Sequence, residues 1–172
     1  LELTGVRRLV VVGAGKAAAA MAVALQREVL SQLKAVLPSL ELQGWINAPA
    51  DALASADVHA LKPIHLHAAR PAGINSPTQA AIQGTQRIVE LVKDCDARDR
   101  VICLLSGGGS ALLVAPTAGV TLADKQAAAR RLTTRSPTAR PWSNQATSKV
   151  WRLRLPMHLP PALTPITAPP AH

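Results

Sequence analysis

The feature that most constrains the fold is an apolar run that ends abruptly in a glycine-rich loop. Residues 101–105 read Val-Ile-Cys-Leu-Leu and are followed at once by Ser106, Gly107, Gly108, Gly109 and Ser110. An apolar run of this length, rich in branched residues, predicts a buried strand, and the glycines predict a loop at its end. Glycines permit positive φ angles and a close approach to a ligand, so successive N–H groups can converge on one anion. Because ligands bind at the carboxyl ends of strands in open α/β sheets, a functional loop is favoured over a plain flexible turn.

Three other segments have the pattern of buried strands, namely Val6–Val12, Leu40–Ile46 and Ile64–His67. Phe and Tyr are absent from the chain, so its core must be packed with aliphatic side chains. Such residues are typical of parallel strands that are covered on both faces.

Helices are predicted between these strands. One begins near Lys16 and runs to Leu37, before Pro38. A second begins at Ser76, with Pro77 in the first helical position, and runs to about Lys93, and a third begins at a Thr121–Asp124 capping box and runs to Leu132. Residues 48–62 are predicted to be loop or broken helix. Four strands alternating with helices predict an α/β fold, a doubly wound, mainly parallel sheet with flanking helices, as one incomplete Rossmann-like domain over residues 1–132.

Residues 133–172 have a different composition, with eight of the 14 prolines and no acidic residue. They show no sustained helical or strand period, which predicts a disordered, Pro-rich, basic tail. The tail could be a proline-rich ligand for a partner domain, but this function is disfavoured because no P-x-x-P set with a basic anchor stands out. A truncated or out-of-frame end fits this composition better.

The formal net charge of +9 comes largely from that tail, since residues 1–132 carry only four of the nine excess charges. A nucleic-acid partner is therefore not indicated for the domain. Cys95 and Cys103 form no C-x-x-C pair and are expected to be core thiols, which favours a cytoplasmic protein. No apolar run has the length of a membrane span. The chain begins at Leu1 and enters a strand almost at once, so a fragment of a longer polypeptide is expected.

A second glycine turn, Gly13-Ala14-Gly15-Lys16, follows the first strand. It is not a Walker A loop, because Val10 replaces the first glycine and Ala17 follows the lysine. It satisfies G-x-G-x-x-A, but the acidic residue of a dinucleotide site is missing from the end of the second strand, with Glu41 at the start of that strand instead. Lys16 stands where a helix N-terminus favours an anion, and Gly13 and Gly15 are candidate binding positions beside it.

Three histidines and one arginine complete the candidates. His59, His65 and His67 lack an accompanying cysteine or carboxylate cluster, so a structural role is favoured over a metal site. Arg70 lies in a turn-rich loop, where it could contact a carboxylate or a phosphate or could be an ordinary surface arginine.

Taken together, the motifs Val-Val-Gly-Ala-Gly-Lys-Ala-Ala at 11–18 and Leu-Ser-Gly-Gly-Gly-Ser-Ala-Leu-Leu at 105–113 resemble the glycerate 2-kinase family. Pro116 and the Gly-Val-Thr-Leu run at 119–122 add to the resemblance, which covers roughly residues 6–132. The loop at 70–75 follows the family's His-Pro-containing loop only loosely. After Leu132 nothing resembles the family.

The resemblance implies an enzyme, a phosphotransferase that uses ATP and Mg²⁺ to phosphorylate D-glycerate to 2-phosphoglycerate in a cleft between two domains. It implies that Lys16 is the catalytic lysine and that residues 106–110 hold substrate or phosphate oxygens. No metal ligands and no oligomeric state are indicated. With the facing half of the cleft missing, this chain is expected to be inactive or nearly so. The alternative is a non-catalytic Rossmann-like module that binds a nucleotide or an anion.

Overall fold

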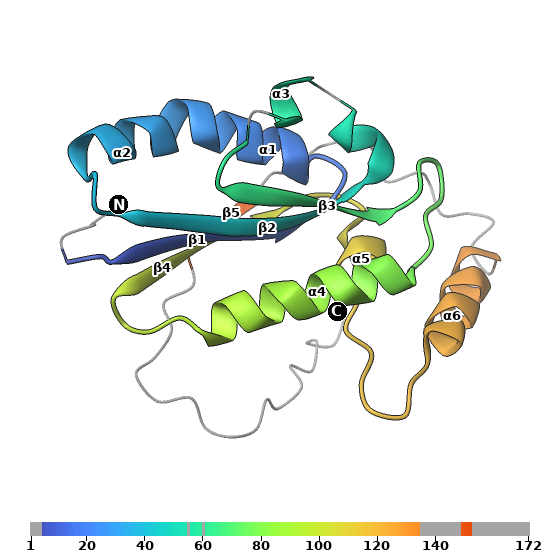
Figure 1. Ribbon diagram of the computed structural model, residues 1–172. Coiled ribbons are helices and arrows are strands. Elements are labelled where there is room, and N and C mark those ends of the chain that lie inside the picture. Colours follow the sequence, from blue (N-terminus) through green and yellow to red (C-terminus); the bar gives the residue numbers. More distant parts are fainter. Residues whose placement is uncertain (1–4, 55, 60, 135–148, 153–172) are drawn as a thin grey trace, which may run out of the picture.

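A five-stranded sheet with the order β3-β2-β1-β4-β5 forms the centre of the molecule (Figure 1). The computed structural model describes residues 5–54, 56–59, 61–134 and 149–152. Strands β1 (Arg8–Ala14), β2 (Glu41–Pro49), β3 (Ile64–Arg70) and β4 (Asp99–Leu105) run parallel. The predicted parallel α/β architecture is therefore confirmed.

Helices cover both faces of the sheet. On one face lie α1 (Ala18–Leu25), the π-helical turn η1 (Gln26–Leu30) and α2 (Ser31–Val36), followed after β2 by η2 (Ala50–Leu53) and α3 (Ala56–His59). On the other face lie α4 (Gln79–Lys93) and the short α5 (Gly109–Leu112), with α6 (Leu122–Thr134) beyond them. Within the described residues, no helix is both long and apolar enough to cross a membrane.

The alternating side chains of β1 supply both layers of the core. Leu9 and Val11 are buried with Leu30 and Ile46 on the α1 face. Val10 and Val12 are buried with helix α4 residues on the opposite face. Cys95 and Cys103 are free, half-buried thiols that pack at the edge of this second layer.

Several elements differ from the sequence prediction. Strand β1 begins at Arg8 and ends at Ala14 rather than spanning Val6–Val12, and β3 continues to Arg70 rather than ending at His67. Strand β2 continues to Pro49 rather than ending at Ile46. The N-cap of α4 is Thr78 rather than Ser76, because the Thr78 hydroxyl accepts the Ala81 N–H at 3.0 Å and also donates to the Ala69 carbonyl at the end of β3. The π-turn η1 interrupts the single helix expected between residues 16 and 37.

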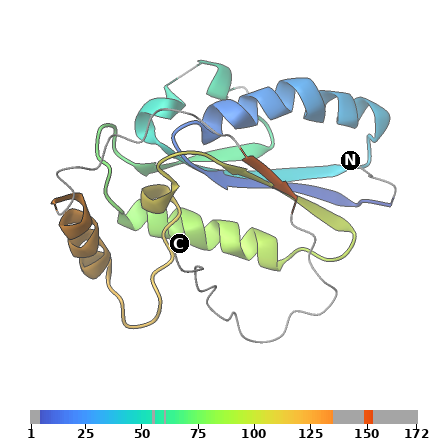
Figure 2. The same cartoon turned by 180° about the vertical axis from the view of Figure 1, so that it is seen from behind.

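The far edge of the sheet is formed by β5 (Lys149–Arg152), which pairs antiparallel with β4 and is seen from behind in Figure 2. This strand was not predicted, since it falls in the proline-rich range 133–172. The rest of that range, apart from the end of α6, lies outside the described residues. At α6 the expected capping box is present, because the Thr121 hydroxyl accepts the Asp124 N–H at 3.1 Å and the Asp124 carboxylate accepts the Thr121 N–H at 2.9 Å.

An ion cluster closes the amino ends of β1 and β4. The side chain of Asp99 is fully buried and accepts hydrogen bonds from Arg7 and Arg8 at 2.7–3.2 Å. Burial by itself would raise the pKa of the Asp99 carboxyl, but the bonds from the two guanidinium groups outweigh it and lower the pKa to about 2.

Asp99 should therefore make folding acid-sensitive. Its folded pKa lies below the unfolded one, so its stabilisation is complete above about pH 4 and is lost as the pH falls toward 2. Asp99→Asn should lower the free energy of unfolding at pH 7 by about 2 kcal/mol and flatten the acid limb. Urea titrations between pH 2 and pH 7 measure both effects. The matched control is Asp57→Asn at the exposed pair with Arg27, expected to change stability by less than about 0.5 kcal/mol. An unchanged acid limb in Asp99→Asn would show that the cluster is not the source.

Candidate functional site

Two glycine loops meet at the carboxyl edge of the sheet, between β1 and β4, where the strand order reverses. The backbone N–H of Lys16 donates to the Gly107 carbonyl at 2.9 Å, and the N–H of Ala17 donates to the Ser106 hydroxyl at 2.9 Å. The Ser106 N–H donates back to the Ala14 carbonyl at 3.2 Å. The loops expected from the sequence to face one crevice are thus joined directly.

Gly13 and Gly15 are required for this junction. A Cβ on Gly13 would overlap the Leu104 carbonyl, and a Cβ on Gly15, whose φ is +142°, would overlap the Ser106 hydroxyl. In a dinucleotide fingerprint the second glycine lets the pyrophosphate approach the backbone. Here Ser106 fills that space, so the arrangement disfavours a dinucleotide at this turn.

The junction also changes where an anion can bind. At the start of α1, the N–H groups of Lys16 and Ala17 already have partners in the opposite loop. The expectation that this helix N-terminus favours an anion beside Lys16 is therefore wrong. The backbone donors that remain available belong to the other loop.

Residues 107–110 carry successive N–H groups that have no backbone partner among the described residues. Gly108 has φ +83° and caps the short α5, and no backbone hydrogen bond from the N–H groups of Gly107, Gly108, Gly109 or Ser110 occurs within the part of the chain that the structure describes. Successive N–H groups around a left-handed residue form a concave donor surface suited to phosphate or carboxylate oxygens. The anion-binding role of this loop stays a prediction.

The Lys16 side chain connects this loop to a pocket. Its carbons run past Gly108, with Cγ only 3.2 Å from where a Cβ on that glycine would stand. Lys16 also lines a pocket of about 380 Å³, in the size range of small-molecule sites. The other residues lining it come from the ends of β2 and β3 and the segments after them: Pro49, Asp51, Ala52, Arg70, Gly73 and Asn75.

Arg70 is not a surface arginine. Only 5% of it is exposed, and its Nη1 donates to the carbonyls of Pro71 and Ile74 in the following turn. Its Nε is buried without a hydrogen-bond partner. Because buried polar atoms are usually paired, this guanidinium is incompletely satisfied by the protein.

Asp51 and Asn75 were missed by the sequence analysis. Asp51 lies two residues after the end of β2. The prediction that no acidic residue follows the second strand is therefore wrong, because it placed the end of that strand at Ile46 rather than Pro49. The signal was present, since an acid just beyond the second strand is where α/β sheets place ligand contacts. Asn75 follows the turn around Gly73, whose φ is +72°.

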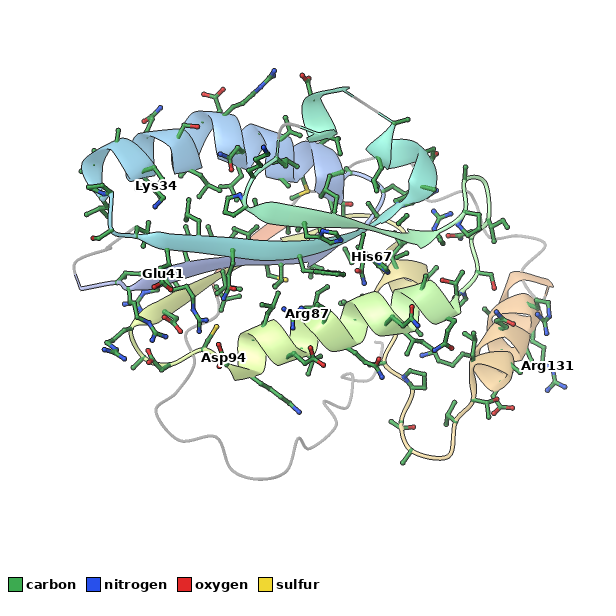
Figure 3. All side chains as sticks on the ribbon, viewed as in Figure 1. Lys34, Glu41, His67, Arg87, Asp94 and Arg131 are labelled. Carbon is green, nitrogen blue, oxygen red and sulfur yellow. The ribbon has the colours of Figure 1, made fainter. Side chains whose placement is uncertain are left out.

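Two of the candidate histidines are packed against Trp45. The ring centroids of Trp45 and His65 are 4.1 Å apart, and those of Trp45 and His67 are 5.4 Å apart. His67 reaches the Ala80 carbonyl of α4 at 2.9 Å, in the space between sheet and helix visible in Figure 3. These contacts give both rings a packing role, whereas the side chain of His59 lies outside the described ones.

Two buried polar residues, Asn47 and Thr85, hold the segment that follows the glycine loop. Asn47 on β2 is fully buried and donates to the Leu112 carbonyl of α5 at 2.8 Å. Thr85 on α4 accepts the Val114 N–H at 2.8 Å. Asn47 also accepts from the Trp45 indole at 3.1 Å. The segment that follows residues 106–110 is thus tied to both β2 and α4.

The fold and these two joined loops define a Rossmann-like α/β domain whose glycine loops meet at the carboxyl edge of the sheet. The chain belongs to the family described as "Domain of unknown function (DUF4147)", whose model matches residues 1–139.

Several relatives have more specific names. A glycerate kinase of Rattus norvegicus is 38% identical over 136 residues, which cover 76% of this chain and 24% of that protein. An Agrobacterium vitis protein provisionally named a hydroxypyruvate reductase is 37% identical over 126 residues, covering 73% of this chain and 28% of that protein. A D-glycerate 2-kinase of Thermotoga maritima is 44% identical over 55 residues, which cover 32% of this chain and 13% of that protein. These relatives confirm the resemblance to the glycerate 2-kinase family for part of the chain.

A solved structure gives the same result for the fold. The PH0495 protein from Pyrococcus horikoshii aligns with a TM-score of 0.58 and 26% identity, covering 78% of this chain and 26% of that one. The chain spans about a quarter of the length of the relatives first matched, between 24% and 28%.

Gly84 offers a test of the buried polar pair. Alanine inside a helix normally stabilises relative to glycine by about 0.5–1 kcal/mol. On α4, however, a Cβ at Gly84 would overlap the Asn47 side-chain oxygen and the His67 ring. Gly84→Ala should therefore destabilise the domain by about 1–3 kcal/mol, measured by thermal and urea unfolding. A stabilised Gly84→Ala would contradict the packing described for Asn47.

Gly15 and Gly107 form a matched pair for testing the loop junction. Gly15→Ala must displace Ser106 and adopt an unfavourable φ, so we expect a loss of about 2–4 kcal/mol. At Gly107 a Cβ would meet nothing within 4 Å, so Gly107→Ala should change stability by less than about 1 kcal/mol. Equal losses in the two variants, measured by urea unfolding, would show that the junction does not depend on Gly15.

Proposed function

We propose that this chain is the Lys16-bearing part of a kinase that transfers the γ-phosphoryl group of ATP to the 2-hydroxyl of D-glycerate. The observation that carries the proposal is the position of Lys16, whose side chain runs close to Gly108 in the loop with unpaired N–H groups and also lines the pocket. The names of the glycerate kinase relatives support the choice of substrate.

The arrangement suits phosphoryl transfer, which needs positioning and charge stabilisation rather than covalent catalysis by the protein. The N–H groups of Gly107 to Ser110 are fixed donors for phosphate oxygens. The ammonium group of Lys16 would offset negative charge on the transferring group. Fixed donors aimed at developing charge lower the barrier because they need no reorganisation during the reaction.

The described residues offer few ligands for a magnesium ion. Within the described residues no group of three or more His, Cys, Asp or Glu side chains could hold a metal ion. Asp51 is the carboxylate among the residues lining the pocket. That fits Mg²⁺ in kinases, which is held by one or two carboxylates together with phosphate oxygens and water. When bound, the ion would neutralise charge on the phosphates, and Asp51 would be its contact on this chain.

We further propose that this chain by itself binds ligands but turns them over slowly or not at all. It corresponds to about a quarter of the length of the relatives first matched. The alternative function, a non-catalytic nucleotide- or anion-binding module, shares the binding behaviour and differs in lacking any turnover.

Lys16→Ala tests the proposal. Titration calorimetry should show that the substitution weakens ATP binding about tenfold or more, equivalent to 1.4 kcal/mol, because the principal cation beside the loop is lost. The matched control is Lys34→Ala on α2, where Nζ is bonded to the Pro38 carbonyl far from the site (Figure 3). It should leave ATP binding unchanged.

Turnover separates the remaining possibilities. Coupled detection of ADP with D-glycerate should give no Lys16-dependent turnover, or very little, from this chain. Rapid ADP formation abolished by Lys16→Ala would show that the chain is catalytically sufficient. If Lys16→Ala leaves ATP binding unchanged, the proposed site at Lys16 is wrong. Consumption of a reduced nicotinamide cofactor with hydroxypyruvate would instead favour the reductase name.

A further inference from the structure

The pocket beside Lys16 contains a buried positive charge that the protein leaves without a counter-charge. Arg70 is 5% exposed, and no ion pair joins it to a carboxylate within residues 5–54, 56–59 and 61–134. Its Nη1 is bonded to neutral carbonyls, and its Nε has no partner. Burying an arginine is costly unless an anion compensates it, so the pocket is electrostatically incomplete.

The residues that line the pocket with Arg70 indicate which kind of ligand could balance its charge. Lys16 provides a second cation and Asp51 the only acid among the residues lining the pocket. Asn75 lines the same pocket and carries an amide that can donate to or accept from a hydroxyl. A ligand with one anionic group and neighbouring hydroxyls would match this set.

The volume limits the ligand further. About 380 Å³ is ample for a small organic acid but lies near the lower end of the range for ligand pockets. The guanidinium is planar, and its fork of donors matches the two oxygens of a carboxylate. Its orientation is fixed by the turn at residues 71–74, whose Pro71 and Ile74 carbonyls accept from Nη1.

We propose that Arg70 is a specificity-determining residue that binds the carboxylate of a small 2-hydroxy acid in this pocket. The inference rests on the proposed function for the identity of the acid. Because Lys16 lines the same pocket, an acid whose carboxylate is held at Arg70 would share that pocket with the Lys16 side chain. A carboxylate and an inorganic phosphate both present anionic oxygens that a guanidinium can bind. The test therefore includes both anions.

The experiment is titration calorimetry of the full chain with D-glycerate, glycerol and inorganic phosphate, each measured separately. The parent chain should bind D-glycerate and fail to bind glycerol, which lacks only the carboxylate function. Arg70→Lys keeps the charge but loses the fork, and should weaken D-glycerate binding about tenfold or more. Circular dichroism and thermal unfolding establish that the variant is folded.

Asp51→Asn provides an independent variant on an exposed residue whose replacement should not disturb folding. Removing its negative charge should tighten D-glycerate binding by about two- to tenfold in metal-free buffer, because a like charge leaves the pocket. A weakening in Arg70→Lys together with a tightening in Asp51→Asn is the pattern expected of a carboxylate subsite. Unchanged D-glycerate binding in both variants would overturn it.

Other outcomes are equally decisive. Absence of D-glycerate binding by the parent chain, or inorganic phosphate binding tightly with the same Arg70 dependence while D-glycerate does not, would overturn the carboxylate assignment. ATP titrations on the same variants distinguish this inference from the proposed function. Loss of Arg70-dependent D-glycerate binding with normal, Lys16-dependent ATP binding would reject only the subsite. Arg70-dependent D-glycerate binding without ATP binding would reject only the kinase.

Discussion

The contact between the Lys16 turn and the Ser106 loop is the constraint on which the rest of the site depends. Parallel β1 and β4 bring the two loops to one edge, but pairing of the strands alone does not join them. The bonds from the Lys16 and Ala17 N–H groups to Gly107 and Ser106 do so, and they require that Gly15 have no side chain. Once those donors are used, the N–H groups of the two loops that have no backbone partner among the described residues are those of residues 107–110, and the Lys16 side chain runs close to Gly108.

This contact also explains a glycine pattern that is easily misassigned. Gly13 and Gly15 satisfy a dinucleotide fingerprint in the sequence, yet in the structure their bare α-carbons accommodate Leu104 and Ser106. The same two residues therefore serve packing between loops rather than the approach of a pyrophosphate.

The sequence predicted the architecture well because its signals were local. Aliphatic runs marked the parallel strands, and Thr121 with Asp124 marked the start of α6. The N-cap at Thr78 could not be separated from Ser76, since the deciding bond runs from its hydroxyl to Ala69 on another element. Likewise, nothing local distinguishes β5 within a proline-rich range, because its strand pairing comes from β4.

For the site, the sequence identified the residues of the two glycine loops. It did not show which loop uses its N–H groups in the junction and which leaves them unpaired. Arg70 was predicted in a turn-rich loop, but it is the last residue of β3 and is buried, with its guanidinium donating to carbonyls of the turn that follows. Asp51 became visible only when β2 was followed to Pro49, which places the acid at the same edge as Lys16. The residues that line this pocket lie at or after the ends of three different strands. A local sequence pattern can indicate each residue separately, but only the fold shows that their charges lie together. Two cations against one carboxylate is a property of that assembled edge, and it makes an anionic ligand the natural occupant.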